Sequence, residues 1–224
     1  MSEPVRIALP AGVEAFADLV AGDEVLLSGP VYTARDATHA RITDALRATG
    51  VLPLDLAGQV LFYAGPTPAA AGRAVGSVGP TTAKRMDAYT PVLLDAGIVA
   101  TIGKGARSDA VREACVRTGA VYLAAVGGSA ALLATHVLSA VSVAWEDLGT
   151  EALVRMELID FPVFVAIDSQ GEDLYASAPA EWRCLEGECR SCKGFSSHSR
   201  VARAPGSRAR YVDWPSVSAT SGTT

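Results

Sequence analysis

Three stretches of this chain decide its fold: Tyr63-Ala64-Gly65-Pro66-Thr67, Gly76-Ser77-Val78-Gly79-Pro80-Thr81-Thr82-Ala83-Lys84-Arg85-Met86-Asp87 and Ile102-Gly103-Lys104-Gly105. Glycines and hydroxyl-bearing residues follow the points where apolar runs end, and cations accompany them. Folding alone does not require so many turns that combine glycines, hydroxyl-bearing residues and cations. The pattern indicates a site that holds a small anion.

Apolar runs with strand composition recur around these corners, at Glu24–Ser28, Gln59–Ala64, Ile98–Ile102, Ala120–Val126, Val141–Ala144 and Val163–Ile167. Most are nearly continuous, which predicts strands covered on both faces. Helical stretches fall between them, one over Asp36–Thr49 that stops at Gly50 and one that Ser108 caps and Gly119 ends. The alternation predicts an α/β layered domain.

Composition restricts the class of protein. The chain has 224 residues, 50% of them hydrophobic, and a net charge of −5, which argues against nucleic acid as a general partner. The segment 180–224 carries seven basic and four acidic side chains, whereas the rest carries twelve and twenty. We therefore predict a domain over residues 1–179 followed by a basic, cysteine-containing and flexible tail over 180–224.

One segment has the length of a membrane span. Thr118–Trp145 contains no charged residue, but Gly127-Gly128-Ser129 interrupts it and several hydroxyls follow. We interpret it as a buried strand, a tight turn near the site, a buried helix and another strand. Because Met1–Ala21 also lacks the pattern of a secretory signal, the sequence predicts a cytoplasmic protein without a membrane span.

The Gly79-Pro80 pair predicts the start of a helix, since proline is favoured in a first helical turn. The free N–H groups of Thr81 and Thr82 would then form an anion site. Thr81 and Arg85 are four residues apart and would share one helix face, so a hydroxyl, a guanidinium and a helix N-terminus would converge. The alternative is a capped helix with a solvated arginine.

Two further cations follow strand ends. Lys104 lies between two glycines after an apolar run, where ligands bind in open α/β sheets, although a lysine in a surface turn is the alternative. Arg35 lies where a strand turns into a helix and could clamp a carboxylate through two hydrogen bonds. Asp36 is predicted to cap that helix. His39 is a candidate acid or base, with a structural role as the alternative.

The four cysteines predict no metal site in this chain. Cys115 lies on the apolar face of a predicted helix and is assigned to the core. Cys184, Cys189 and Cys192 have a spacing that echoes part of a ferredoxin motif, and with His198 they could form a zinc site. We favour no metal there, because the surrounding segment offers little core to position the ligands.

The motifs together resemble those of the class I fumarases, specifically their C-terminal domain, which in two-chain enzymes is the β subunit of fumarate hydratase or L-tartrate dehydratase. The resemblance covers residues 5–178 and rests on Leu27–Asp36, Tyr63–Thr67, Gly79–Asp87, Ile102–Gly105, Gly127–Ala131, Glu151-Ala152, Asp160-Phe161-Pro162 and Asp168–Tyr175. It implies an α/β fold of the swivelling β/β/α type found in iron–sulfur hydro-lyases.

The resemblance also implies a function and a set of site residues. The family binds a [4Fe-4S] cluster through three cysteines of the other domain or of an α-type partner subunit, so this chain would hold no cluster itself. Arg35, Arg85 and Lys104 would bind a four-carbon dicarboxylate, with fumarate or malate favoured over tartrate. Thr81 would move the carbon-bound proton, and the partner would supply the acid that handles the leaving water. Gly79, Thr82, Asp36 and His39 are further candidates, and an α2β2-like hetero-oligomer is expected.

Two departures from the family pattern keep a second hypothesis open. The cysteine-containing tail is not part of the pattern, and the segment His136–Val143 lacks the lysine expected there. The alternative function is a non-catalytic regulatory module that binds a dicarboxylate or another anion. The sequence does not fix the dicarboxylate, the oligomer or the role of the tail.

Overall fold

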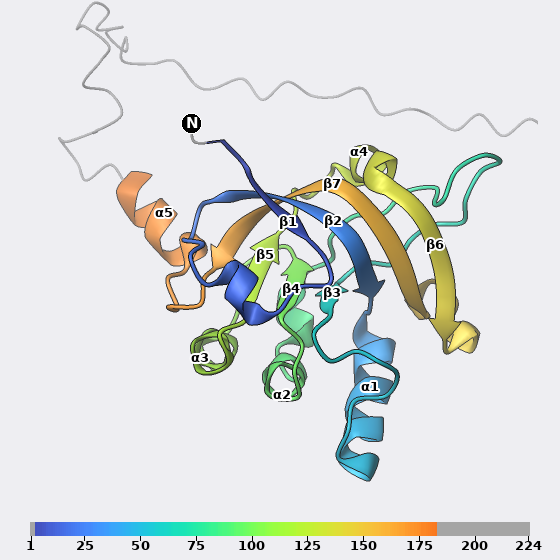
Figure 1. Ribbon diagram of the computed structural model, residues 1–224, viewed down its shortest axis with the longest axis horizontal. Helices are drawn as coiled ribbons and strands as arrows, with labels where there is room; N and C mark the ends of the chain where they lie inside the picture. The colour runs from blue at the N-terminus through green and yellow to red at the C-terminus, as the bar shows by residue number, and fades with distance from the viewer. Residues whose placement is uncertain (1–2, 183–224) are drawn as a thin grey trace, which may run out of the picture. The chain divides into compact units, whose positions relative to one another are not determined.

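The computed structural model describes residues 3–182, which form a mixed α/β domain built around a closed sheet (Figure 1). The strands are β1 Val5–Ala8, β2 Glu24–Thr33, β3 Val60–Phe62, β4 Ala100–Gly103, β5 Val121–Ala124, β6 Val137–Ala144 and β7 Leu153–Ile167. The α-helices are α1 Asp36–Thr49, α2 Thr90–Asp95, α3 Asp109–Thr118, α4 Ala130–Leu133 and α5 Leu174–Trp182. Short 3-10 helices are η1 Val13–Phe16, η2 Ala83–Met86, η3 Ala134–His136 and η4 Glu146–Glu151.

The sheet closes into a small barrel. Its strand order is β1-β2-β3-β4-β5-β7-β6, and a further antiparallel pairing of β2 with β7 joins the two sides. Strands β2, β3, β4 and β5 run parallel to one another, whereas β7 is antiparallel to β2, β5 and β6. The predicted α/β class is confirmed, and the predicted layered sheet is in fact a closed one.

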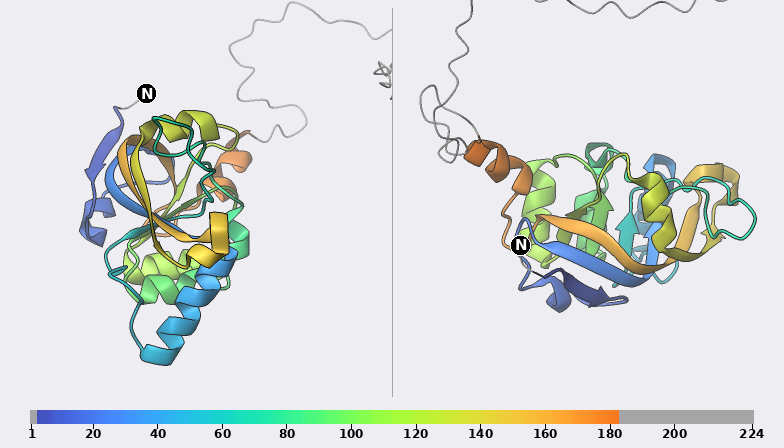
Figure 2. Two further views of the ribbon diagram at one scale, coloured as in Figure 1. Left: turned by 90° about the vertical axis from the view of Figure 1, so that its right-hand side faces the viewer. Right: turned by 90° about the horizontal axis from the view of Figure 1, so that it is seen from above.

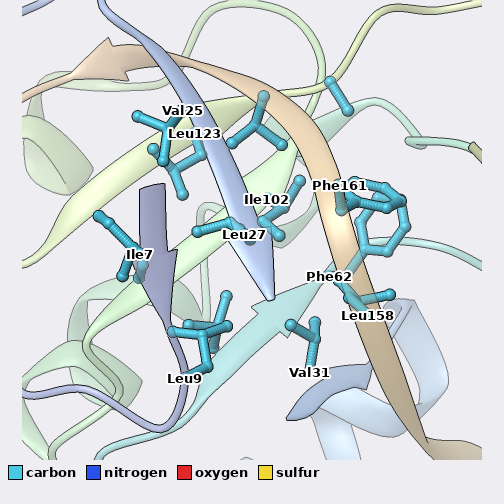
Figure 3. Packing of buried hydrophobic residues seen from close by; sticks show 14 of the residues in the cluster. Ile7, Leu9, Val25, Leu27, Val31, Phe62, Ile102, Leu123, Leu158 and Phe161 are labelled. Carbon is cyan, nitrogen blue, oxygen red and sulfur yellow. The ribbon is translucent and has the colours of Figure 1, made fainter. Parts of the chain in front are cut away.

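Two hydrophobic cores lie on opposite faces of the central strands. Along β3 and just beyond it, Val60 and Phe62 belong to the core inside the barrel, while Leu61 and Tyr63 belong to the core under the helices. Figure 3 shows the barrel core, which includes Val25, Leu27 and Val31 of β2, Phe62 of β3, Ile102 of β4, Leu123 of β5 and Phe161 of β7. The outer core includes Ile42 of α1, Leu93 of α2 and Val111 of α3. The prediction of strands covered on both faces is therefore confirmed for β3, β4 and β5.

The helices follow the predicted signals closely. Helix α1 spans Asp36–Thr49 and ends at Gly50, whose φ of 75° is the left-handed conformation that glycine adopts without a steric penalty. Helix α3 begins after Ser108 and ends at Gly119 in the same way, although the Ser108 hydroxyl makes no capping hydrogen bond. Helices α1, α2 and α3 lie together on the outer side of the barrel, below it in Figure 1 and in the left view of Figure 2.

The charge-free segment Thr118–Trp145 has the predicted order of strand, turn, helix and strand, but its second half is not buried. In helix α4 only Leu133 is buried, and β6 exposes most of its residues. The reason is that β6 lies outside the barrel and pairs only with β7, so one face of it lacks a covering layer. Within residues 3–182 no helix is long and apolar enough to cross a bilayer.

Candidate functional site at the ends of the parallel strands

The candidate residues lie at the edge of the barrel where parallel strands end. Strands β2, β3 and β4 are neighbours and run in the same direction, so their carboxyl ends share one edge. Arg35 follows β2, and Lys104 follows β4 directly. Thr81 is fixed to the end of β3, because its N–H donates to the carbonyl oxygen of Tyr63 at 2.7 Å. The fold therefore brings residues from three separate sequence motifs to one edge of the sheet.

Thr81 and Arg85 meet as the sequence spacing predicts. Arg85 Nη2 donates a hydrogen bond to Thr81 Oγ1 over 2.8 Å. The backbone between them is not the predicted one, since the helix begins at Ala83 and is a single 3-10 turn. The prediction of a helix starting at Pro80 is wrong.

The backbone of the threonine pair explains that difference. Lys104 N–H donates to Thr81 O at 3.2 Å, and Ala83 N–H donates to Lys104 O at 2.9 Å. These bonds form a parallel bridge between Thr82 and Lys104 that holds the segment extended beside the end of β4. The N–H of Thr81 already donates to the carbonyl oxygen of Tyr63, so this amide is not free to bind an anion as predicted.

Asp36 does not cap helix α1. Arg35 occupies the N-cap position and Asp36 is the first helical residue. The Asp36 carboxylate instead lies 3.2 Å from Arg85 Nη2, the same nitrogen that donates to Thr81. Both side chains are partly exposed, so this pair contributes little to folding, but it holds the guanidinium beside the Thr81 hydroxyl.

Lys104 extends toward the glycine turn that follows β5. A Cβ added to Gly127 would lie 3.3 Å from Lys104 Cδ and 3.6 Å from Lys104 Nζ. The tight turn Gly127-Gly128-Ser129 is therefore near the site, as the sequence predicts. Gly105, directly after Lys104, has a φ of +88°, a conformation that side-chain-bearing residues rarely adopt.

Gly79 serves close packing within the described structure. A Cβ at this position would lie 2.8 Å from the Cβ of Ala130 in helix α4. Val78 N–H also donates to Ala130 O at 3.2 Å. Only glycine lets the segment before Thr81 approach α4 so closely, and its role in binding stays a prediction.

His39 lies in the outer core beneath the site edge rather than on it. Its side chain is fully buried, and its ring packs edge-on against Tyr63 with 5.1 Å between ring centroids. Its Nδ1 lies 2.8 Å from the carbonyl oxygen of Arg35. Because a carbonyl only accepts, Nδ1 carries the proton of the neutral ring. Burial, the largest cause, lowers the pKa of His39 to about 4, so the ring is neutral at pH 7.

This buried histidine makes the stability of the domain depend on pH. The folded state keeps His39 neutral down to about pH 4, whereas the unfolded chain takes up a proton below about pH 6.5. The free energy of unfolding should therefore fall by up to about 3 kcal/mol as the pH is lowered through this range. We expect His39→Phe to flatten this dependence in urea unfolding at pH 7, 6 and 5. If the free energy of unfolding fell with pH equally in the variant and the wild type, His39 would not be the cause of the pH dependence.

Sequence reasoning missed a buried arginine behind the site. The Arg107 side chain has no exposed surface, and Arg107 Nε donates to Asp87 Oδ1 at 2.6 Å. Arg107 Nη2 donates to Thr90 Oγ1 at 2.7 Å, and the guanidinium stacks on the rings of Tyr63 and Tyr122. Burial opposes the charge, but the interactions with Tyr63 and Asp87 outweigh it and raise the pKa of Arg107.

Sequence reasoning also left Glu151 without a role beyond its place in a motif. Its Oε1 lies 3.4 Å from Arg35 Nη2. No local pattern marks either Glu151 or Arg107, because their partners lie far away along the chain.

The described residues do not fit an iron–sulfur cluster. Cluster ligands are thiolates, and the cysteine in residues 3–182 is Cys115, which lies on the buried face of helix α3 and has its pKa raised to about 11 by burial. Across the same residues, no group of three His, Cys, Asp or Glu side chains is placed to hold a metal ion. Cys184, Cys189, Cys192 and His198, like the predicted tail, lie outside the described residues.

A family model and several relatives of known name match this chain. A model of the family described as "Fumarase C-terminus" matches residues 2–178. The chain belongs to this family. That match spans the strand-end motifs, the η4 segment and the first half of helix α5.

Its relatives fall into two groups of different length. Fumarate hydratase 2 of Leishmania major is 39% identical over 161 residues, which are 71% of this chain but 28% of that protein. The anaerobic class I fumarate hydratase of Escherichia coli is 36% identical over 74% of this chain and 30% of its own length. The L(+)-tartrate dehydratase subunit beta of Escherichia coli is 33% identical over 75% of this chain and 84% of its own length. The chain thus spans less than a third of these fumarate hydratases and most of the tartrate dehydratase subunit.

Proposed function

We propose that this chain is the β-type subunit of a [4Fe-4S]-dependent hydro-lyase that reversibly adds water to, or removes it from, a four-carbon dicarboxylate. The convergence of Thr81, Arg85 and Lys104 at one sheet edge, with Arg35 at the end of the neighbouring strand, is the observation that supports it best. The names of the relatives, fumarate hydratase and tartrate dehydratase, support the same reaction class. Fumarate and malate are the favoured substrates, and tartrate is next.

The cations suit the charge that develops in such a reaction. Removing a proton from the carbon beside a carboxylate moves negative charge onto that carboxylate, and fixed cations stabilise it. Arg35, Arg85 and Lys104 supply three positive charges, while Asp36 and Glu151 offset two of them. The constellation is therefore left with a net positive charge, which favours the binding of a dicarboxylate.

Thr81 is the group that we assign to proton transfer. In the dehydration direction its alkoxide-like oxygen accepts the proton from carbon, and the electron pair of that bond forms the carbon–carbon double bond. The hydroxyl leaves as water with a proton from the acid that the partner would supply. A threonine hydroxyl is a weak base at its ordinary pKa. The hydrogen bond from Arg85 Nη2 stabilises negative charge on the oxygen and so favours this role.

The cluster and the acid for the leaving water would come from an α-type partner. Three observations support a partner: the described residues offer no cluster ligands, the fumarate hydratases are more than three times as long as the matched region, and two relatives are named "subunit beta". The charge-free segment after β5 also supports a partner, because it leaves several aliphatic side chains more than half exposed: Val126, Leu132, Leu138 and Val141. When bound, the cluster would supply an iron that holds the substrate. An α2β2-like assembly is part of this proposal.

An anaerobic assay tests the function. The chain would be assayed with fumarate, malate and both tartrates, alone and with an α-type subunit, after cluster reconstitution. We expect turnover only when both subunits are present, and the compound that reacts would identify the substrate. A size measurement of the pair would test the assembly. No turnover with a fully loaded partner would favour the non-catalytic anion-binding module instead.

A further inference from the structure

Arg35 is held by its main chain before its guanidinium makes any contact. It has an extended conformation at the N-cap position of α1, with φ −120° and ψ −162°. Its carbonyl oxygen accepts two hydrogen bonds from His39, one from the backbone N–H and one from Nδ1, each 2.8 Å long. These bonds fix the main chain of Arg35, and with it the point from which the side chain extends.

The side chain of Arg35 passes between a glycine and a carboxylate. A Cβ on Gly65 would lie 3.2 Å from Arg35 Nη1 and 3.3 Å from Arg35 Cδ, so the absence of a side chain at Gly65 makes room for it. Arg35 Nη2 lies 3.4 Å from Glu151 Oε1. About a quarter of each charged side chain is exposed, so solvent screens this pair less than the surface pairs of the domain.

Glu151 is itself fixed to helix α1, the helix that Arg35 precedes. Its Oε2 accepts a hydrogen bond from Ala37 N–H at 3.0 Å, and its carbonyl oxygen accepts one from Thr38 Oγ1. The N-terminal end of a helix stabilises a carboxylate in this position. One carboxylate oxygen is thus bound to the helix while the other faces the guanidinium.

We propose that Glu151 is a positioning residue that orients the Arg35 guanidinium toward one carboxylate of the substrate. The proposal rests on the proposed function for the identity of the ligand, but not for the orientation of Arg35. A purely electrostatic role predicts the opposite effect, because removing a negative charge beside Arg35 would strengthen the attraction of a dianion. The sign of the change in affinity therefore separates positioning from neutralisation.

The test compares Glu151→Gln with a matched control in the same 3-10 helix. Asp147 in η4 accepts two hydrogen bonds from Arg41 of α1, so it joins the same two elements without touching Arg35. In the reconstituted pair, Glu151→Gln should raise KM for the dicarboxylate about tenfold, because the ion pair that orients the guanidinium is lost, and change kcat less than threefold. Asp147→Asn should leave both constants unchanged. A KM that is unaltered or lower in Glu151→Gln would overturn the proposal.

A second measurement does not depend on activity. In the full chain labelled with ¹⁵N-arginine, the ion pair with Glu151 should slow rotation about the Nε–Cζ bond of Arg35, so its Nη signals should be separate in the wild type and in Asp147→Asn. They should merge in Glu151→Gln, and Arg35→Lys would identify them by their loss. Separate signals in Glu151→Gln would overturn positioning even if the enzyme were active. A wild type without turnover would refute the proposed function and leave this result to decide the role of Glu151.

Discussion

Thr81→Ala is expected to lower kcat by at least about a hundredfold, the lower end of what a positioned acid–base group contributes. The variant removes the hydroxyl and the γ-methyl group but keeps the backbone bonds of Thr81 to Tyr63 and Lys104, which do not involve the side chain. Arg35, Arg85 and Lys104 remain in place to bind the substrate, so KM should change less than threefold. The measurement is anaerobic steady-state kinetics with the reconstituted partner.

Two companion variants separate proton transfer from loss of packing. In the wild type Arg85 Nη2 lies 2.8 Å from the Thr81 hydroxyl oxygen. Thr81→Ser keeps a hydroxyl within reach of that nitrogen and should retain most of the activity. Arg85→Lys keeps the charge but not the planar set of donors, and it should lower kcat and raise KM together. An active Thr81→Ala enzyme would remove Thr81 from the mechanism and leave the site with binding residues alone.

The sequence predicts those parts of the molecule whose causes are local. Helix α1 has the predicted bounds Asp36–Thr49 because Gly50 provides a left-handed end. Each predicted strand lies within or overlaps an observed one, because a buried strand needs a continuous apolar run. Helical spacing predicts the contact between the Thr81 and Arg85 side chains. In the structure a β-bridge between Thr82 and Lys104 and a 3-10 turn bring the two side chains together instead.

Long-range pairing accounts for most of what the sequence did not predict. Barrel closure joins β2 to β7, whose residues Glu24 and Phe164 are 140 positions apart, and no local pattern reports such a partner. The exposed β6 was expected to be buried because its apolar composition does not tell which layer will cover it. Glu151 and Arg107 each depend on partners that only the closed fold brings near.

Arg107→Met is expected to lower the free energy of unfolding by about 3–5 kcal/mol, the usual effect of breaking a buried ion pair from one side. Methionine fills much of the volume but leaves the Asp87 carboxylate, which is 12% exposed, without its charged partner. Asp87 Oδ2 also accepts a hydrogen bond from Ser108 N–H at the start of α3, at 2.7 Å. The loss should therefore loosen the start of α3, and urea unfolding at pH 7 measures it.

Arg117→Met is the matched control for this prediction, because Arg117 binds Asp95 on the surface through two hydrogen bonds of 2.9 Å. That pair is about half exposed, and its removal should cost less than about 1 kcal/mol. If burial is the cause, the double variant Arg107→Met/Asp87→Asn should be more stable than Arg107→Met alone, since the orphaned charge is then gone. Equal losses for Arg107→Met and Arg117→Met would mean that the buried network contributes no more than a surface pair.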